Sequence, residues 1–201
     1  MLDLKREWFK PQERFIGKTL GKLPITPNQW TITSVLFALL GLFFVIKANF
    51  VLALIMFFMA GVLDFVDGSV ARAKKMVSNT GAYIDTIVDR YVEGIMFMSL
   101  LFVSLPIIGV PAYVWVCLAI FGSIITTYAK AAAKEKDLVL KELKGGLLSR
   151  GERIILLLIL FTLLIFSQYY VATIILIIIA ILANFTALQR VFSATSLNKE
   201  K

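Results

Sequence analysis

Long apolar stretches alternate with short polar breaks along most of the chain. A helix that crosses a bilayer core needs about 20 apolar residues. Six stretches approach this length, at residues 28–47, 51–73, 82–104, 111–132, 152–168 and 169–189. Helices joined by short turns pack as antiparallel neighbours. The pattern therefore predicts an all-α membrane protein with six transmembrane helices.

The first 23 residues show a different pattern. Apolar residues alternate there with basic and acidic ones, as in an amphipathic helix that lies in the plane of the membrane interface. No linker rich in Pro, Gly or Ser divides the chain. We therefore expect a single domain over residues 1–201, with an N-terminal interfacial helix at 1–23, a six-helix bundle at 28–189 and a cytoplasmic tail at 190–201.

The positions of the basic residues predict an orientation for the bundle. The chain has a net charge of +8, and its basic residues gather in the N-terminal segment, the 74–75 turn, the 134–150 loop and the tail. Lys47 is the only basic residue in the loops on the opposite side. By the positive-inside rule, both termini and the basic loops face the cytoplasm of a cell membrane. The positive charge thus follows membrane topology and does not indicate a nucleic-acid partner.

The composition removes several kinds of chemistry. The sequence has no histidine and one cysteine, which excludes the commonest general base, the usual zinc ligand and an intramolecular disulfide. Acid–base chemistry must then rest on carboxylates, lysine or tyrosine.

Acidic residues occur at depths in the second and third stretches where a membrane helix rarely carries charge. Asp64 and Asp67 are three residues apart, and Asp85 and Asp89 are four apart, so each pair shares one helical face. Ionisable residues inside membranes are costly and mark functional sites. Two such carboxylates would repel each other by roughly 3 kcal/mol at ~6 Å and an effective dielectric constant of ~20. We expect all four to converge on one cleft.

Three explanations of this acidic cluster remain open. Oxygen-only ligands select a hard cation such as Mg²⁺ or Mn²⁺, and four carboxylates suffice for two ions beside phosphates. The acids could instead line an ion pathway, or pair with nearby basic residues such as Arg72 and Arg90. Gly68 and Gly81 favour the first explanation, since they leave helix backbone accessible to a phosphate, although glycines also serve helix packing. Arg72 offers a planar fork for a pyrophosphate.

Taken together, these residues form one long motif, Asp64-x-x-Asp67-Gly68-x-x-Ala71-Arg72, eight residues, then Gly81-x-x-x-Asp85-x-x-x-Asp89. This motif resembles the signature of the CDP-alcohol phosphotransferase family, whose length and six-span layout the chain also resembles. The resemblance implies that the metal ligands are Asp64, Asp67, Asp85 and Asp89. It implies that Asp89 is also the general base, and that the assembly is a homodimer. The residues that it implies for binding the CDP-linked donor are Thr31, Asp67, Gly68, Arg72, Ser78 and Gly81.

The second half of the chain resembles the phosphatidylinositol-phosphate synthase branch of that family and its archaeal ether-lipid relatives. The residues implied to bind the phosphate of inositol phosphate are Thr127, Lys130, Arg150, Arg153 and Arg190. The chain departs from this branch at Ala132, where a basic residue is common. It also contains no Gly-Lys-x-Lys-Thr element after the fourth stretch, an element found in relatives that use glycerol phosphate. An alternative role for the basic residues is snorkelling toward anionic headgroups.

The resemblance implies a reaction as well as a fold. A phosphatidyl or archaetidyl group would pass from CDP-diacylglycerol or CDP-archaeol to inositol phosphate, with release of CMP. Another acceptor, such as glycerol phosphate or serine, and a cation transporter are the alternatives. A transporter would not require Gly68, Arg72 and Gly81 in this register.

Overall fold

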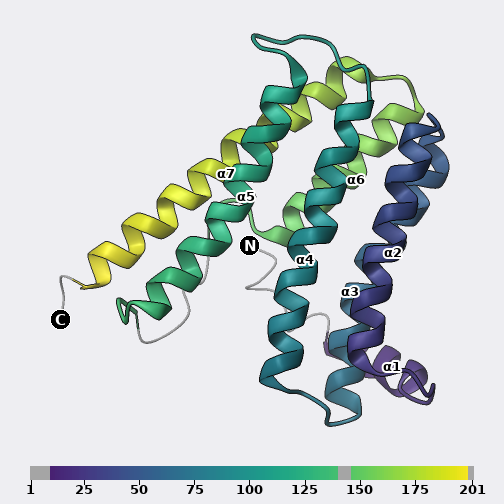
Figure 1. The fold of residues 1–201 in the computed structure, drawn as a ribbon, viewed down its shortest axis with the longest axis vertical. Coiled ribbons are helices and arrows are strands. Elements are labelled where there is room, and N and C mark those ends of the chain that lie inside the picture. Colours follow the sequence, from purple (N-terminus) through teal and green to yellow (C-terminus); the bar gives the residue numbers. More distant parts are fainter. Residues whose placement is uncertain (1–9, 140–145, 199–201) are drawn as a thin grey trace. The chain divides into compact units, whose positions relative to one another are not determined.

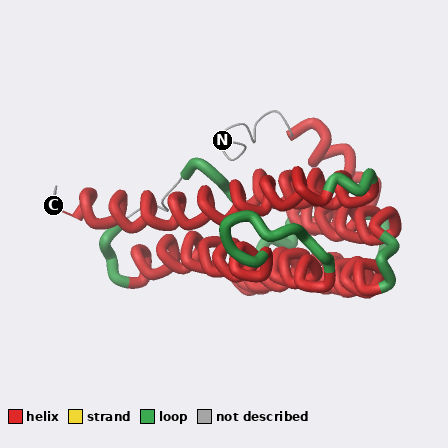
Figure 2. Tube along the Cα trace, turned by 90° about the horizontal axis from the view of Figure 1, so that it is seen from above, coloured by secondary structure: helices red, strands yellow, loops and turns green. Residues whose placement is uncertain are grey.

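The computed structural model describes residues 10–139 and 146–198, which are helical apart from short connecting loops (Figure 2). Two compact units divide these helices, one within Arg6–Val103 and the other within Ser104–Lys201. The first unit contains α1 (Lys10–Leu20), α2 (Pro27–Ile46), α3 (Phe50–Ala73), α4 (Asn79–Ser99) and the 3-10 turn η2 (Leu100–Phe102). The second contains α5 (Ala112–Glu135), α6 (Arg150–Ile165) and α7 (Tyr169–Asn198). The expected single domain stays a prediction.

All six apolar stretches form helices, but several predicted ends are wrong. The third stretch was expected to reach residue 104, whereas α4 ends at Ser99 and the 3-10 turn η2 follows it. The fifth was expected to begin at 152, whereas α6 begins at Arg150, because Glu152 accepts a hydrogen bond from the Ser149 backbone N–H at 2.7 Å and caps the helix there. Helix α7 continues beyond residue 189 to Asn198, and the assignment of residues 190–201 to a cytoplasmic tail stays a prediction.

Length and composition alone support four of the six predicted spans. Helices α2, α3, α5 and α7 are long and apolar enough to cross a membrane. Helix α4 carries Asp85, Asp89, Arg90 and Glu93, and charged residues lower its mean hydropathy. Helix α6 has 16 residues, fewer than the approximately 20 that a bilayer core requires. Within the described residues, the structure is thus that of an all-helical membrane protein with four candidate spans.

In the first unit, α2 packs along α3 and also contacts α4. Helix α2 begins at Pro27 because Thr26 and Gln29 form a capping box, in which Gln29 Oε1 accepts the Thr26 backbone N–H at 2.8 Å. A Cβ atom at Gly41 would overlap the ring of Phe57, so glycine permits the close approach of these two helices. This packing places the first turns of α2 beside the end of α3 that carries the aspartates.

Helix α1 lies against α3 in the same unit (Figure 1). It begins at Lys10, with Pro11 in its first turn, where the missing N–H of proline has no helical partner to lose. The side chain of Phe15 is 73% exposed, and Lys18 is exposed as well. An amphipathic helix was expected over residues 1–23. The structure has a helix over Lys10–Leu20, and residues 1–9 lie outside the described part.

In the second unit, α7 packs against α5 and α6. Asn184 Nδ2 donates to the Leu118 carbonyl at 2.8 Å. A Cβ atom at Gly122 would lie 2.8 Å from the Asn184 backbone nitrogen, so this crossing of α5 and α7 also depends on glycine. One turn further on, Thr126 Oγ1 lies 3.1 Å from the Ala183 carbonyl oxygen. The crossing fixes the end of α5 beside α7.

Candidate metal centre

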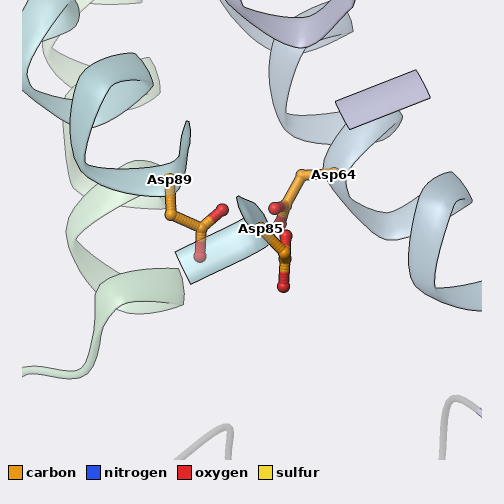
Figure 3. Close-up of side chains that lie close together, drawn as sticks. All are labelled: Asp64, Asp85 and Asp89. Atoms are coloured by element: carbon orange, nitrogen blue, oxygen red, sulfur yellow. The ribbon is translucent and has the colours of Figure 1, made fainter. Parts of the chain in front are cut away.

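Three of the predicted metal ligands lie together in the first unit. Asp64 extends from α3, and Asp85 and Asp89 extend from α4 (Figure 3). One carboxylate oxygen from each of them lies within 4.8 Å of the other two. Such a set of oxygen ligands fits a hard divalent cation and excludes soft metals. The expected convergence of acids from two neighbouring helices is confirmed for these three.

Asp67 lies one turn after Asp64 on α3 and makes a separate contact with α2. Its side chain is 5% exposed, and its Oδ2 accepts a hydrogen bond from Thr31 Oγ1 at 2.5 Å. The close packing of α2 on α3 therefore directs this carboxylate toward α2. Thr31, which was expected to bind the donor, is placed here as a residue that orients Asp67. Metal binding by Asp67 and donor binding by Thr31 stay predictions.

Arg90 reduces the repulsion among the acids. Its Nη1 lies 3.3 Å from Asp89 Oδ2 and donates to the Thr86 carbonyl at 3.3 Å. The alternative of pairing with a basic residue therefore holds for Asp89 and Arg90. Asp64 and Asp85 place their carboxylates in the same space as Asp89.

The guanidinium group of Arg72 lies over Gly68, one helical turn earlier on α3. A Cβ atom at Gly68 would lie 3.4 Å from Arg72 Nη1 and 3.7 Å from Nη2. Arg72 Nη2 also forms an ion pair with Glu13 Oε2 of α1 at 2.9 Å. Glu13 was not predicted, because nothing in its local sequence marks a residue that packs on α3.

Ser78 and Gly81 form the start of α4. Ser78 Oγ accepts a hydrogen bond from the Gly81 backbone N–H at 3.0 Å, as the N-cap of the helix. A Cβ atom at Gly81 would lie 3.1 Å from this hydroxyl and 3.5 Å from Asn28 Oδ1. The cap fixes where α4 begins and so sets the position of Asp85, one turn further on. Asn28 was not predicted, although its side chain lies beside Gly81.

The predicted acceptor residues lie in the second unit, where α7 holds the segment that precedes α6. Gln189 Oε1 accepts the Leu147 backbone N–H at 3.2 Å, and Thr186 Oγ1 accepts that of Leu148 at 3.0 Å. Gly146 has φ +123°, and a Cβ atom there would lie 3.9 Å from Arg190 Nε. This segment leads directly into Arg150, the first residue of α6.

Arg190 connects this segment with the end of α5. Its Nη1 donates to the Thr126 carbonyl at 2.8 Å, next to Thr127. Lys130 lies on the following turn of α5. The bonds of α7 thus place Arg190 beside the Thr126 carbonyl and hold the segment that leads to Arg150. The shared phosphate site stays a prediction.

Arg153 is almost completely enclosed by protein. Its exposed fraction is 1%, and its Nη1 donates to the Leu148 carbonyl at 3.2 Å. Snorkelling requires the charged group to reach water or headgroups, so that alternative is wrong for Arg153. The residue supports the segment before α6, and phosphate binding by Arg153 stays a prediction.

Comparisons with known proteins bear on the whole chain. The family model of CDP-alcohol phosphatidyltransferases matches residues 24–187. Archaetidylinositol phosphate synthase of Pyrococcus horikoshii is 35% identical over 191 residues, which are 92% of this chain and 91% of that protein.

The fold is also found in solved structures of phosphatidylinositol phosphate synthase from Mycobacterium tuberculosis. The crystal structure in complex with manganese and citrate has a TM-score of 0.79 at 21% identity and covers 92% of this chain and 89% of the other. The crystal structure with CDP-DAG bound has a TM-score of 0.77 at 21% identity and covers 90% of this chain and 92% of the other. With the family model spanning most of its length, the chain belongs to the CDP-alcohol phosphatidyltransferase family.

Proposed function

We propose that this protein is a metal-dependent membrane enzyme that transfers a phosphatidyl or archaetidyl group from a CDP-linked lipid to inositol phosphate and releases CMP. The observation that carries the proposal is the group of three carboxylates from α3 and α4, whose oxygens lie within 4.8 Å of one another. Family membership and the archaetidylinositol phosphate synthase of Pyrococcus horikoshii support this reaction over a cation pathway.

The acidic residues would hold two divalent cations, Mg²⁺ or Mn²⁺. Asp64, Asp85 and Asp89 supply oxygens to one space, and Asp67 would complete the ligands while Thr31 holds one of its oxygens. Bound cations would neutralise negative charge on the phosphates of the donor. Manganese in the related mycobacterial structure supports a divalent ion.

The donor would bind along the face of α3 and the start of α4. Arg72 would donate N–H groups to the pyrophosphate beside Gly68. Gly81 and Ser78 would border the nucleotide at the start of α4, where the Ser78 cap keeps the backbone in place. The lipid chains of CDP-diacylglycerol or CDP-archaeol would lie against apolar helix surfaces in the membrane, so no water-filled cavity is needed for them.

Asp89 would act as the general base. The carboxylate takes the proton from the acceptor hydroxyl as that oxygen attacks the lipid-linked phosphorus. A new P–O bond forms to the acceptor, and the P–O bond to the CMP phosphate breaks, so CMP leaves with the electron pair. The ion pair with Arg90 restrains the orientation of Asp89 during this exchange.

Arg190 provides the test of the acceptor site. If its guanidinium binds the phosphate of inositol phosphate, Arg190→Gln removes a charge-assisted bond but keeps a donor for the Thr126 carbonyl. The acceptor KM should then rise about 10- to 150-fold, which corresponds to about 1.5–3 kcal/mol, with little change in donor KM. Initial rates of CMP release at varied acceptor and donor concentrations measure both constants.

Lys136→Gln is the matched control for Arg190, since Lys136 is exposed and pairs with Glu135 at the end of α5. It should change neither constant. Snorkelling of Arg190 to headgroups predicts no selective effect on the acceptor. An unchanged acceptor KM in Arg190→Gln would remove the inositol phosphate assignment and leave the family assignment intact.

We further propose that α4 and α6 complete six spans, that α1 lies in the interface, and that both termini and the metal centre face the cytoplasm. The arrangement of basic residues supports this orientation.

Val77 and Ile107 are 69% and 72% exposed, in loops expected on opposite sides. In a Cys117→Ser background, a cysteine replacing Ile107 should react with an impermeant thiol reagent on intact cells, and one replacing Val77 should not. The reverse result would contradict the orientation. The homodimer stays a prediction.

A further inference from the structure

Helix α1 is fixed to the end of α3 by close backbone contact. A Cβ atom at Gly17 would lie 2.5 Å from the Ser69 carbonyl oxygen and 3.0 Å from Ala73 Cβ. Glycine is required here because any side chain would push the two helices apart. Gly17 lies one turn after Glu13 on α1, so this contact also fixes the position of Glu13.

A second contact holds the segment between α1 and α2. Lys74 Nζ donates to the backbone carbonyls of Leu23 and Ile25, both at 2.8 Å. Lys74 follows directly after α3. The segment is therefore tied to α3 two residues beyond Arg72, while Gly17 is held at Ser69 and Ala73. These two attachments on α3 flank Arg72, the residue that Glu13 contacts.

The ion pair between Glu13 and Arg72 is the chemical consequence of this docking. Glu13 Oε2 lies 2.9 Å from Arg72 Nη2, with side chains 13% and 41% exposed respectively. Glu13 is thus the more enclosed partner, in a position fixed by α1. Arg72 is the more exposed partner, with its guanidinium group close to Gly68. The acid on α1 holds the arginine on α3.

We propose that Glu13 is a positioning residue that orients Arg72 for the donor pyrophosphate. The inference rests on the proposed role of Arg72 in donor binding. A guanidinium group has five N–H donors in a fixed plane. A carboxylate bound at Nη2 fixes the orientation of that plane and leaves the other N–H groups to donate to the pyrophosphate. An arginine that is already ordered loses less conformational freedom when a phosphate binds.

The negative charge of Glu13 has an opposing effect, because it weakens the attraction between Arg72 and an anion. Solvent screens this effect, since the Arg72 side chain is 41% exposed. The ordering of the guanidinium group is not screened in this way. We therefore expect ordering to dominate, so that loss of Glu13 weakens donor binding.

Two variants remove the contact in independent ways. Glu13→Ala deletes the carboxylate, and Gly17→Ala displaces α1 from Ser69 and carries Glu13 away from Arg72. Each should raise the KM for CDP-diacylglycerol by about 3- to 10-fold, with kcat and the KM for inositol phosphate unchanged. Glu135→Ala is the matched control, because it removes an exposed acid whose partner, Lys136, is also exposed. It should leave all three constants unchanged.

The double variant Glu13→Ala/Arg72→Ala identifies the route of the effect. If Glu13 acts through Arg72, the double variant has the donor KM of Arg72→Ala alone. Additive increases would overturn the inference, as would a donor KM that is unchanged or lowered in Glu13→Ala while Arg72→Ala raises it. Those results leave the proposed donor site intact. An unchanged donor KM in Arg72→Ala would overturn both the inference and the donor-binding role of Arg72.

Discussion

Asp85→Asn is expected to abolish CMP release. The substitution keeps the shape of the side chain but removes its negative charge from the space that it shares with Asp64 and Asp89. Because an amide is a much weaker ligand for a hard cation than a carboxylate, divalent-ion binding should weaken. Metal ions stabilise the charge that develops in the transition state of phosphoryl transfer by several kcal/mol. Loss of the metal should therefore lower the rate by at least about 10³-fold. CMP release by the purified protein with Mg²⁺ measures the effect.

Two comparisons show whether this loss belongs to the metal centre. Asp137→Asn changes an exposed acid after α5, at φ +53°, a conformation that asparagine tolerates. It should retain full activity. Asp89→Asn should lose about 10²- to 10⁴-fold in turnover and keep donor binding, as expected for a general base. Equal loss of turnover and donor binding in Asp89→Asn would identify Asp89 mainly as a ligand. Full activity of Asp85→Asn, or of the wild type in EDTA, contradicts the metal centre.

The existence of the helices could be predicted from the sequence because the bilayer sets one dominant length for apolar segments. Their ends could not, since local bonds determine them. The hydrogen bond from the Ser149 backbone N–H to Glu152 starts α6 at Arg150, within a charged segment that hydropathy assigns to a loop. Helix α7 continues past residue 189 because Ala194 packs with Ala133 and Val139 of the same unit.

In the site, too, residues that share one helical face could be predicted from their spacing, whereas contacts between different helices could not. The i, i+4 spacing of Asp85 and Asp89 predicts a shared face, and the structure confirms that they meet Asp64. Spacing also grouped Asp67 with them, and its hydrogen bond with Thr31 of α2 required the packing of the two helices. The pairing of Glu13 with Arg72 depends in the same way on the docking of α1, so it required the fold.

The metal-dependent transfer from a CDP-linked lipid to inositol phosphate is the central claim, and the dependence of CMP release on the alcohol tests it most directly. Attack by a specific hydroxyl means that CMP should form only when that alcohol is present. The wild-type protein is incubated with Mg²⁺ and CDP-diacylglycerol or CDP-archaeol, and with inositol phosphate, glycerol phosphate, serine or no alcohol. We expect inositol phosphate to raise CMP release at least about 100-fold over the other three conditions, since a site built to pair with the polar groups of one acceptor rejects alcohols that lack them. CMP release with glycerol phosphate or serine but not with inositol phosphate would contradict the acceptor, and no CMP release with any alcohol would contradict the reaction.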